Sequence, residues 1–343
     1  MPRFQPRDAP AAQASFATVE RFLITDTDIA CGNTNAINEE ALKEAYDNVR
    51  SQHAPPVVSG TDLLSQIESK LRILPFGCES IDAMLEGGFR EGQVLEIYGD
   101  SGSGKTQLCM MACARAAARK ARVLYIDTSN SFSSTRIVTM LKAIPDAKDH
   151  LEEAVDRISV VRAYTAHAAL AALDTLLQQN SSVFSRSSNT RPNLVILDSI
   201  GAVIAPVLGA GGSSRTHLQG HVLLAAAATL LKQVALQLNA AVLVTNHMVG
   251  GGGGDGDRGG AVGGAGPSRT TGRNLNENEI KRPALGESWS HQCHCRVQLS
   301  LPPSEGYPWT AVVRGSTMLT PGKSVAPYWL TSAGACAVAP AAS

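Results

Sequence analysis

The chain has few aromatic residues, no net charge and no paired set of cysteines, and each shortage narrows the range of functions. Phenylalanine, tyrosine and tryptophan make up 5% of the 343 residues, and 30 basic residues balance 30 acidic ones. Without a basic excess, any contact with nucleic acid has to come from a local patch rather than from the whole surface. Seven cysteines without a paired framework indicate a reducing compartment.

Long apolar runs are missing as well. We find no stretch that is long and apolar enough to span a membrane, and the N-terminus lacks the apolar core of a secretory signal. These absences predict a soluble intracellular protein without a membrane partner.

What the sequence does contain is a glycine-rich loop with the pattern G-x-x-x-x-G-K-T. The apolar run 94–98 leads into it, and a segment of helix formers, 107–119, follows. Glycines let backbone N–H groups curl around phosphate oxygens, and the start of a helix adds its positive dipole. The pattern therefore predicts binding of a nucleoside triphosphate rather than a strand–helix turn that binds nothing. The loop residues are Gly99, Asp100, Ser101, Gly102, Ser103, Gly104, Lys105 and Thr106.

A second nucleotide motif is predicted at residues 194–198, an apolar run that ends in a carboxylate. Lys105 of the loop can reach the β- and γ-phosphates, and the Thr106 hydroxyl can ligate Mg²⁺. At the carboxyl end of a buried strand, Asp198 is placed to hold the same Mg²⁺ or its water shell. Thr106 and Asp198 are thus the predicted metal-binding residues.

Beyond the loop, short continuous apolar segments alternate with helical ones. This rhythm is typical of a parallel sheet covered on both faces. The predicted strands are 122–127, 158–162, 194–198, 241–245, 295–301 and 310–314, and the predicted helices are 133–144, 166–179 and 217–238. The predicted fold class is α/β, with a P-loop core around a mostly parallel central sheet.

The chain divides into three predicted regions. Residues 1–50 are partly disordered with room for a small helical domain, whose best helix candidate is 38–46. Residues 51–70 are a linker with prolines and glycine, followed by a linker helix. Residues 71–343 hold the α/β core.

Four segments carry a resemblance to the RecA-like recombinases of eukaryotes and archaea. They are Gly-Lys-Thr-Gln at 104–107, Tyr-Ile-Asp-Thr at 125–128, Leu-Asp-Ser at 197–199 and Val-Thr-Asn-His at 244–247. Within that family the chain is most similar to the D-type paralogues, a subfamily of mediator subunits. Thr-Asn-His at 245–247 and Arg-Pro-Ala-Leu-Gly-Glu-Ser-Trp-Ser at 282–290 carry this closer likeness, and the resemblance as a whole covers about residues 57–331.

This resemblance implies a RecA-type ATPase core behind a small helical N-terminal domain, with ATP and Mg²⁺ bound at subunit interfaces. It implies that Asn246 and His247 sense the γ-phosphate and relay its state to a DNA loop. Arg136 falls where the family packs an arginine near the adenine, and a solvated helix residue is the alternative. The catalytic residues implied in this way are Lys105, Asp198, Asn246 and His247.

One departure from the family concerns hydrolysis. After Tyr-Ile-Asp-Thr, active recombinases carry a glutamate that activates the attacking water, and here that position is Ser129. A serine hydroxyl cannot serve as a resting general base, and losing a base typically removes roughly 10²–10⁴-fold of rate. We expect good ATP binding with slow hydrolysis, or hydrolysis completed by a partner subunit.

Two segments are candidates for DNA contact, residues 209–215 after the Asp198 strand and residues 249–283 after strand 241–245. Both leave the carboxyl ends of strands, where ligands collect in such sheets. A flexible basic loop suits the backbone of single-stranded DNA. By composition alone, however, the second segment also fits a disordered linker. The candidate DNA-binding residues are Arg215, Arg258, Arg269, Arg273, Lys281 and Arg282.

The linker carries a candidate contact with other subunits. Residues 57–60, Val-Val-Ser-Gly, fall where filament-forming members of the family carry Phe-x-x-Ala. Valine buries less surface than phenylalanine, so we expect weaker self-assembly. A C-type paralogue is the candidate partner on this side, and a plain linker is the alternative.

Histidine and cysteine gather at residues 291–295, His-Gln-Cys-His-Cys. All four candidate ligands lie within five residues, and there is no second cluster to complete a tetrahedral zinc site. Neighbouring residues of a strand also point to opposite faces. We therefore interpret this segment as a short strand rather than as a zinc site.

The chain as a whole is predicted to be an ATP-binding recombinase paralogue in homologous-recombination DNA repair. The resemblance implies a nuclear protein that works on single-stranded DNA in a hetero-oligomeric mediator complex. A C-type paralogue would bind the N-terminal and linker side, and another paralogue would bind the ATPase core. The alternatives are an active DNA-dependent ATPase or strand-exchange recombinase, and a RecA-like helicase or signalling ATPase.

Overall fold

The computed structural model describes residues 57–70, 72–181, 191–209, 214–249 and 282–339, with the isolated positions 44, 47, 48 and 51. Contacts divide the chain into two units, residues 1–70 and 71–343. In the first unit, helix α5 (Gly60–Lys70) occupies the predicted linker helix, and Ser59 Oγ accepts the backbone N–H of Asp62 at its start. The predicted helix 38–46 lies outside the described residues apart from Glu44.

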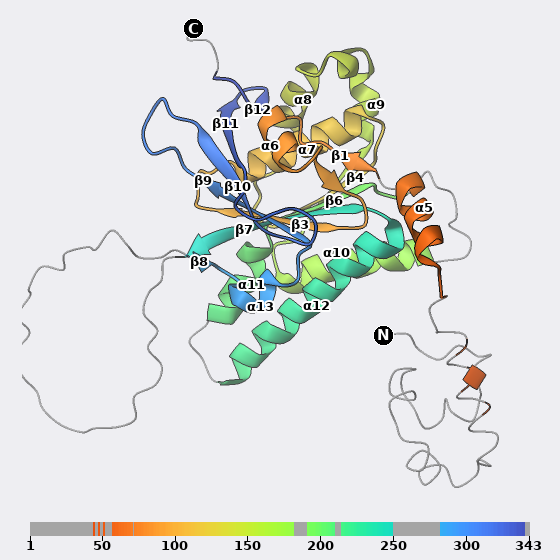
Figure 1. The fold of residues 1–343 in the computed structure, drawn as a ribbon. Helices are drawn as coiled ribbons and strands as arrows, with labels where there is room; N and C mark the ends of the chain where they lie inside the picture. Colours follow the sequence, from red (N-terminus) through yellow and green to blue (C-terminus); the bar gives the residue numbers. More distant parts are fainter. Residues whose placement is uncertain are drawn as a thin grey trace, which may run out of the picture. The chain divides into compact units, whose positions relative to one another are not determined.

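A ten-stranded sheet organises the second unit (Figure 1). Its strand order is β12-β11-β10-β9-β3-β7-β6-β4-β5, and β8 pairs with β7 outside this path. A separate two-stranded sheet joins β1 (Ile73–Leu74) to β2 (Phe89–Arg90). The strands of the large sheet are β3 (Val94–Gly99), β4 (Val123–Asp127), β5 (Ile158–Arg162), β6 (Leu194–Asp198), β7 (Ala241–Val249), β8 (Arg282–Pro283), β9 (Cys295–Ser300), β10 (Trp309–Ser316), β11 (Val325–Thr331) and β12 (Gly334–Cys336).

The strands from β9 to β5 run parallel, whereas β10, β11 and β12 extend the sheet in antiparallel fashion. The register places Gly99 of β3 beside His247 of β7, and Asp127 of β4 beside Asp198 of β6. All four residues therefore reach the carboxyl edge of the parallel strands, where open α/β sheets bind their ligands.

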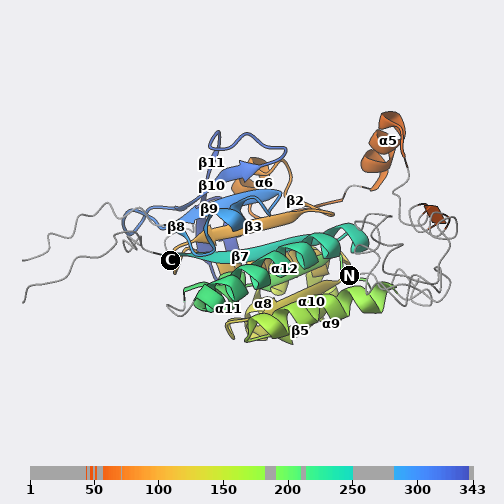
Figure 2. The same ribbon diagram turned by 90° about the horizontal axis from the view of Figure 1, so that it is seen from below.

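Helices cover both faces of this sheet (Figure 1). α6, α7, α8 and α9 lie on one face and α10 to α13 on the other, and Figure 2 shows α10, α11 and α12 running side by side. A short 3₁₀ helix, η1 (Pro145–His150), joins α8 to α9. The helices are α6 (Glu79–Met84), α7 (Lys105–Ala118), α8 (Ser134–Lys142), α9 (Leu151–Asp156), α10 (Ala166–Ser181), α11 (Ile200–Gly209), α12 (Ser214–Leu238) and α13 (Gly286–Ser290).

The central strands are buried on both faces, which explains their continuous apolar sequence. Every residue of β3 and β6 is buried, as are the first six residues of β7. One core includes Leu108 of α7 and Tyr125 of β4, and the other includes Leu231 of α12 and Trp289 of α13. The predicted α/β class with a mostly parallel sheet is confirmed.

All of the strands and helices predicted beyond the loop occur, with ends shifted by a few residues. The sequence reading missed α11 because Pro206 lies inside it, and proline normally ends a helix. As a correction, the candidate DNA loop 209–215 does not follow the Asp198 strand directly. Residue 209 ends α11, and residues 214 and 215 begin α12.

A second correction concerns the absence of a long apolar run. Leu218–Leu238 of α12 is long and apolar enough to cross a membrane by length and composition, with a mean hydropathy of 1.4. In the fold, 44% of this stretch is buried, and one side of α12 packs into a core cluster with Leu231 and Val234. A helix that covers a buried sheet meets the same criterion as a membrane span, so this single stretch is weak evidence for one.

Two leucines of α12 test this assignment. Leu231 is 1% exposed and Leu236 is 71% exposed. We expect Leu231→Ala to lower the free energy of unfolding by about 2–5 kcal/mol, since it removes buried apolar contacts. Leu236→Ala should change it by less than about 0.5 kcal/mol. Urea unfolding followed by circular dichroism measures both, and equal effects of the two variants would contradict the packing of α12.

Candidate nucleotide site

The glycine-rich loop lies between the end of β3 and the start of α7, at the carboxyl edge of the parallel strands. Gly102 and Gly104 have φ values of 80° and 86°, in the left-handed region that favours glycine. At Gly99, an added Cβ would lie 2.4 Å from the carbonyl oxygen of Leu299. The glycines therefore permit a tight strand–loop–helix turn of the kind that binds phosphate.

The chemical groups inside this turn fit an anion. Lys105 Nζ folds back to donate to the carbonyl oxygens of Gly99 at 2.9 Å and Asp100 at 2.7 Å. Burial lowers the pKa of Lys105, and the charge of Asp198 acts against this shift. Ser103 Oγ is buried and has no hydrogen-bond partner among the described residues. A half-buried ammonium and an unpaired hydroxyl in the same turn suit a phosphate ligand.

Asp198 ends β6 and is 2% exposed. Its Oδ1 accepts a hydrogen bond from Thr245 Oγ1 at 2.5 Å, and its Oδ2 accepts one from the Tyr125 hydroxyl at 2.8 Å. Burial and the nearby Asp198 charge raise the pKa of Tyr125, so this phenol remains a donor. Thr106 lies half-buried in the first turn of α7. Thr106 and Asp198 are the residues of this edge that could hold Mg²⁺.

The loop after β4, which the structure describes in full at residues 128–133, contains no carboxylate side chain that could replace the missing glutamate. Ser129 is exposed, and its hydroxyl lies 3.0 Å from that of Ser131. The neighbouring Asp127 is 1% exposed, and its carboxylate accepts the backbone N–H groups of Ser129, Ser131 and Phe132 at 3.1 Å each. Asp127 therefore shapes the loop, and its three backbone bonds oppose its use as a general base on water.

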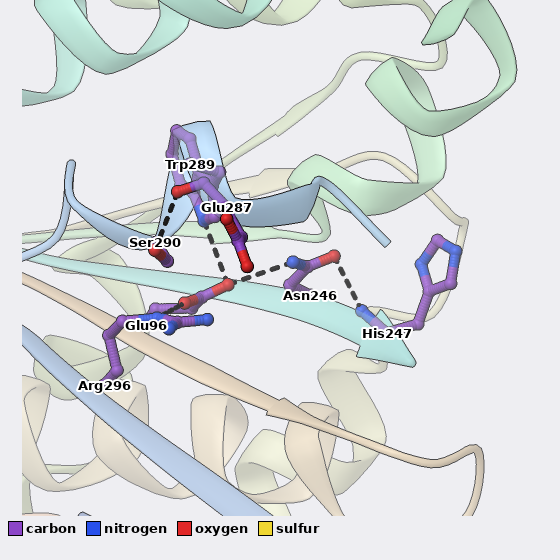
Figure 3. A network of polar contacts seen from close by, with 7 residues as sticks. All are labelled: Glu96, Asn246, His247, Glu287, Trp289, Ser290 and Arg296. Carbon is purple, nitrogen blue, oxygen red and sulfur yellow. Dashed lines mark hydrogen bonds and ion pairs between the residues drawn. The ribbon is translucent and has the colours of Figure 1, made fainter. Parts of the chain in front are cut away.

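Asn246 and His247 take different positions at the end of β7 (Figure 3). Both ends of the Asn246 amide are engaged, because Nδ2 donates to Glu96 at 3.0 Å and Oδ1 accepts the backbone N–H of His247 at 2.9 Å. The His247 imidazole is half-buried, and its pKa is lowered by burial and then by the charge of Lys105. Of the two predicted sensors, His247 is the one whose pKa responds to the charge of Lys105, and its ring lies against Gly201 of α11.

Glu96 is the residue of this site that the sequence reading missed. It lies in the middle of β3 with 0% exposure, and Figure 3 shows donors from three directions. Oε1 accepts from Asn246 Nδ2 and from Trp289 Nε1 at 2.9 Å, and Oε2 accepts from Arg296 Nε at 2.6 Å. The available signal was a lone charged residue inside the apolar run 94–98, because a buried carboxylate requires partners.

The two ends of the candidate DNA segment 249–283 are held together. β7 pairs with β8 through Met248 with Pro283 and Val249 with Arg282, and Arg282 is exposed. Glu96 binds one residue before the segment, Asn246, and one residue after it, Trp289. Of the other predicted DNA-binding residues, Arg215 lies in the first turn of α12, and Arg258, Arg269, Arg273 and Lys281 lie outside the described residues.

Arg136 of α8 is not the solvated helix residue offered as its alternative. Its Nε donates to Gln107 Oε1 at 2.9 Å, and its two terminal nitrogens donate to the carbonyl oxygens of Thr331 and Ser332. The guanidinium thus connects the nucleotide helix α7 with the turn between β11 and β12. Its predicted place beside the adenine stays a prediction.

The histidine and cysteine segment has no metal-site geometry within the described part of the chain. His294 Nδ1 accepts the backbone N–H of Val94 at 3.0 Å, which occupies that ring nitrogen. Of this segment only Cys295 lies in a strand, at the start of β9, and residues 291–294 form a turn after α13, so the interpretation of the whole segment as a strand is wrong. Among the described residues, no group of three histidine, cysteine, aspartate or glutamate side chains could hold a metal ion.

A parallel sheet with a phosphate loop after β3 and a buried aspartate at the end of β6 defines a RecA-like P-loop ATPase fold. The crystal structure of the RadB recombinase has this fold, with a TM-score of 0.56 and 22% identity, and the likeness covers 78% of this chain and all of that one. This likeness supports the fold alone.

The family is defined by sequence. The Rad51 family model matches residues 68–300, and the chain belongs to the Rad51 family. It is 35% identical to DNA repair protein RAD51 homolog 4 of Bos taurus over 83% of this chain and 81% of that protein. The Mus musculus protein of the same name is 32% identical over 73% of this chain and 67% of that protein. RAD51 homolog 4 is the D-type paralogue, so the predicted resemblance is confirmed.

The Glu96 network makes a testable prediction about stability. Glu96→Gln removes the negative charge while keeping the size of the side chain, and it leaves the guanidinium of Arg296 without its counter-charge. We expect the free energy of unfolding to fall by about 3–5 kcal/mol, the usual cost of breaking a buried ion pair. The matched control is Glu287→Gln, because Glu287 is exposed on α13. Chemical denaturation measures both, and a Glu96→Gln variant as stable as the control would contradict a structural role for the charge.

Proposed function

We propose that this chain is an ATP-binding recombinase paralogue that acts in homologous-recombination DNA repair. The observation that carries the proposal is the combination of membership in the Rad51 family with a full G-x-x-x-x-G-K-T loop and a serine, Ser129, where a glutamate is expected. The family consists of ATP-binding proteins. Such a combination supports a nucleotide-gated subunit of a mediator complex over a strand-exchange enzyme.

For the nucleotide, the loop amides and Lys105 would hold the phosphates, and Thr106 and Asp198 would hold Mg²⁺. The bound metal would neutralise phosphate charge. Lys105 would exchange its bonds to the Gly99 and Asp100 carbonyl oxygens for phosphate oxygens. His247 is half-buried, its pKa responds to the charge of Lys105, and it would respond to the γ-phosphate in the same way.

For DNA, the segment 249–283 is the candidate contact. Its two ends are joined by the β7–β8 pairing beside the nucleotide edge, and Arg282 is exposed there. Arginine and lysine in such a segment would bind the phosphate backbone of single-stranded DNA without reading sequence, with an affinity that falls as salt rises. The net charge of zero supports weak binding by the isolated chain.

For another paralogue on the ATPase core, the candidate surface is the edge strand β5. It ends the strand order of the sheet, and Val160 and Val161 are 39% and 37% exposed. A cavity of about 400 Å³ beside it is lined by Ser159, Val161 and Ala172 among others. An extended segment of the partner could pair with this edge and place apolar side chains in the cavity. The C-type paralogue is proposed for the linker side, where Val57 is fully exposed.

The proposed location is the nucleus, where recombination takes place in eukaryotes. Fluorescence microscopy of the tagged full chain tests it, and a cytoplasmic signal that persists after DNA damage would contradict it.

The first experiment measures Mg·ATP binding and turnover by the purified chain, with and without single-stranded DNA. We expect binding that Lys105→Ala abolishes, together with turnover far below the roughly 10 s⁻¹ of an ordinary enzyme. Ser129→Glu should raise the turnover, because a carboxylate restores a base whose absence costs roughly 10²–10⁴-fold. Ser129→Gln introduces a side chain of the same shape as glutamate but without the charge, and it should not raise the turnover. Brisk DNA-stimulated turnover by the unmodified chain would contradict the proposal, as would DNA repair that is intact with Lys105→Ala.

A second experiment separates the two partner surfaces by co-purification with the other recombinase paralogues. Val161→Asp puts a charge into the β5 cavity and should release the core partner while retaining the C-type paralogue. Val57→Asp should have the opposite selectivity. The control is Val155→Asp, because Val155 is 39% exposed on α9 and does not line this cavity. Loss of both partners in every variant, or of neither, would count against these surfaces.

A further inference from the structure

Two aromatic residues near the C-terminus form a cross-strand pair that contacts the phosphate loop. Trp309 of β10 is the register partner of Tyr328 of β11, and their rings stack with centroids 6.5 Å apart. Both lie beyond residues 68–300, the part of the chain that the Rad51 family model matches. Their contacts with the loop are therefore a feature of this chain that the family match does not describe.

The pair donates to two consecutive carbonyl groups of the loop. The Tyr328 hydroxyl donates to the Ser103 carbonyl oxygen at 2.7 Å, and Trp309 Nε1 donates to the Gly102 carbonyl oxygen at 3.3 Å. Tyr328 is 0% exposed, and burial raises its pKa, so its hydroxyl stays protonated as a donor. The tryptophan bond is longer than the usual 2.7–3.2 Å, so Tyr328 makes the stronger contact of the two.

These bonds set the orientation of two peptide groups. In a trans peptide the carbonyl and the following N–H point in opposite directions, so holding the carbonyl also holds the N–H. Tyr328 thereby turns the N–H of Gly104 away from itself. Trp309 does the same for the N–H of Ser103, which closes the turn onto the Asp100 carbonyl oxygen at 3.2 Å.

Apolar side chains of β11 and of the segment between β9 and β10 complete the contact. Leu330, two residues after Tyr328 on β11, approaches Gly104 so closely that an added Cβ there would lie 2.9 Å from it. Leu301, just after β9, lies 3.7 Å from the corresponding point at Gly102. Leucine side chains therefore pack against both glycines, and at Gly104 they leave no room for a side chain.

We propose that Trp309 and Tyr328 are positioning residues of the nucleotide site. The C-terminal antiparallel strands hold the phosphate loop in its binding conformation, and the affinity for the phosphate groups depends on these two donors. The expected effect of these residues on affinity rests on the proposed ATP binding. Their effect on the conformation of the loop does not depend on bound nucleotide.

The first test compares Tyr328→Phe and Trp309→Phe, which keep an aromatic ring and remove the donor. The probes are Mg·ATP and inorganic tripolyphosphate, measured by calorimetry at a temperature where each variant is folded. We expect Tyr328→Phe to weaken both probes by the same factor of about 2–10, the usual worth of one hydrogen bond. Trp309→Phe should weaken them less, and Tyr307→Phe, a change at a tyrosine that is 58% exposed, should leave them unchanged.

The second test reads the loop without nucleotide. Hydrogen exchange of the backbone amides 102–106 should be about 2–10-fold faster in Tyr328→Phe than in the unmodified chain, and less accelerated in Trp309→Phe. Unchanged exchange in folded variants would overturn the inference. Faster exchange would support it even if the unmodified chain failed to bind Mg·ATP, and that failure would count against the proposed function alone. If Tyr328→Phe does not fold, Trp309→Phe decides the question by the same two measurements.

Discussion

A carboxylate can stay charged in the middle of a fully buried strand only if donors surround it, and Glu96 imposes this requirement on three other elements of the fold. Asn246, Trp289 and Arg296 meet it from β7, α13 and β9. The phosphate loop follows Glu96 on β3, and His247 follows Asn246 on β7. One buried charge thus aligns the loop, the predicted γ-phosphate sensor and the strand pairing at the base of segment 249–283.

Two aspartates at neighbouring strand ends have different surroundings, which suit different roles in the site. Asp127 and Asp198 are register partners, yet their surroundings differ. The Asp127 carboxylate accepts hydrogen bonds from backbone N–H groups. The Asp198 carboxylate accepts them from hydroxyl groups, and its charge acts on Lys105. Binding a metal and phosphates requires only the second of these environments. Activating water requires a free base, and the loop that Asp127 shapes supplies none. On the proposed function, this local geometry would separate nucleotide binding from hydrolysis.

The parts of this site that lie in continuous motifs could be predicted from the sequence, and the parts made by distant residues could not. Residues 99–106 and Asp198 were identified because local pattern alone determines a strand–loop–helix turn and a strand that ends in a carboxylate. Glu96 was missed because its three donors come from positions 150 to 200 residues later. The helix α11 was missed because proline normally ends a helix, whereas Pro206 lies inside this one, which packs against the sheet.

The contact between Ser103 and Tyr328 spans 225 residues, and this distance has a consequence for the making of the protein. At the usual rates of synthesis of about 5–20 residues per second, the phosphate loop leaves the ribosome roughly 10–45 s before the tyrosine that holds it. The central strand β3 is likewise synthesised before β7 and β9, the strands that pair with it on its two sides. A nascent or C-terminally truncated chain would therefore carry the complete loop sequence without the strands that support it. Nucleotide binding in this protein is a property of the finished chain.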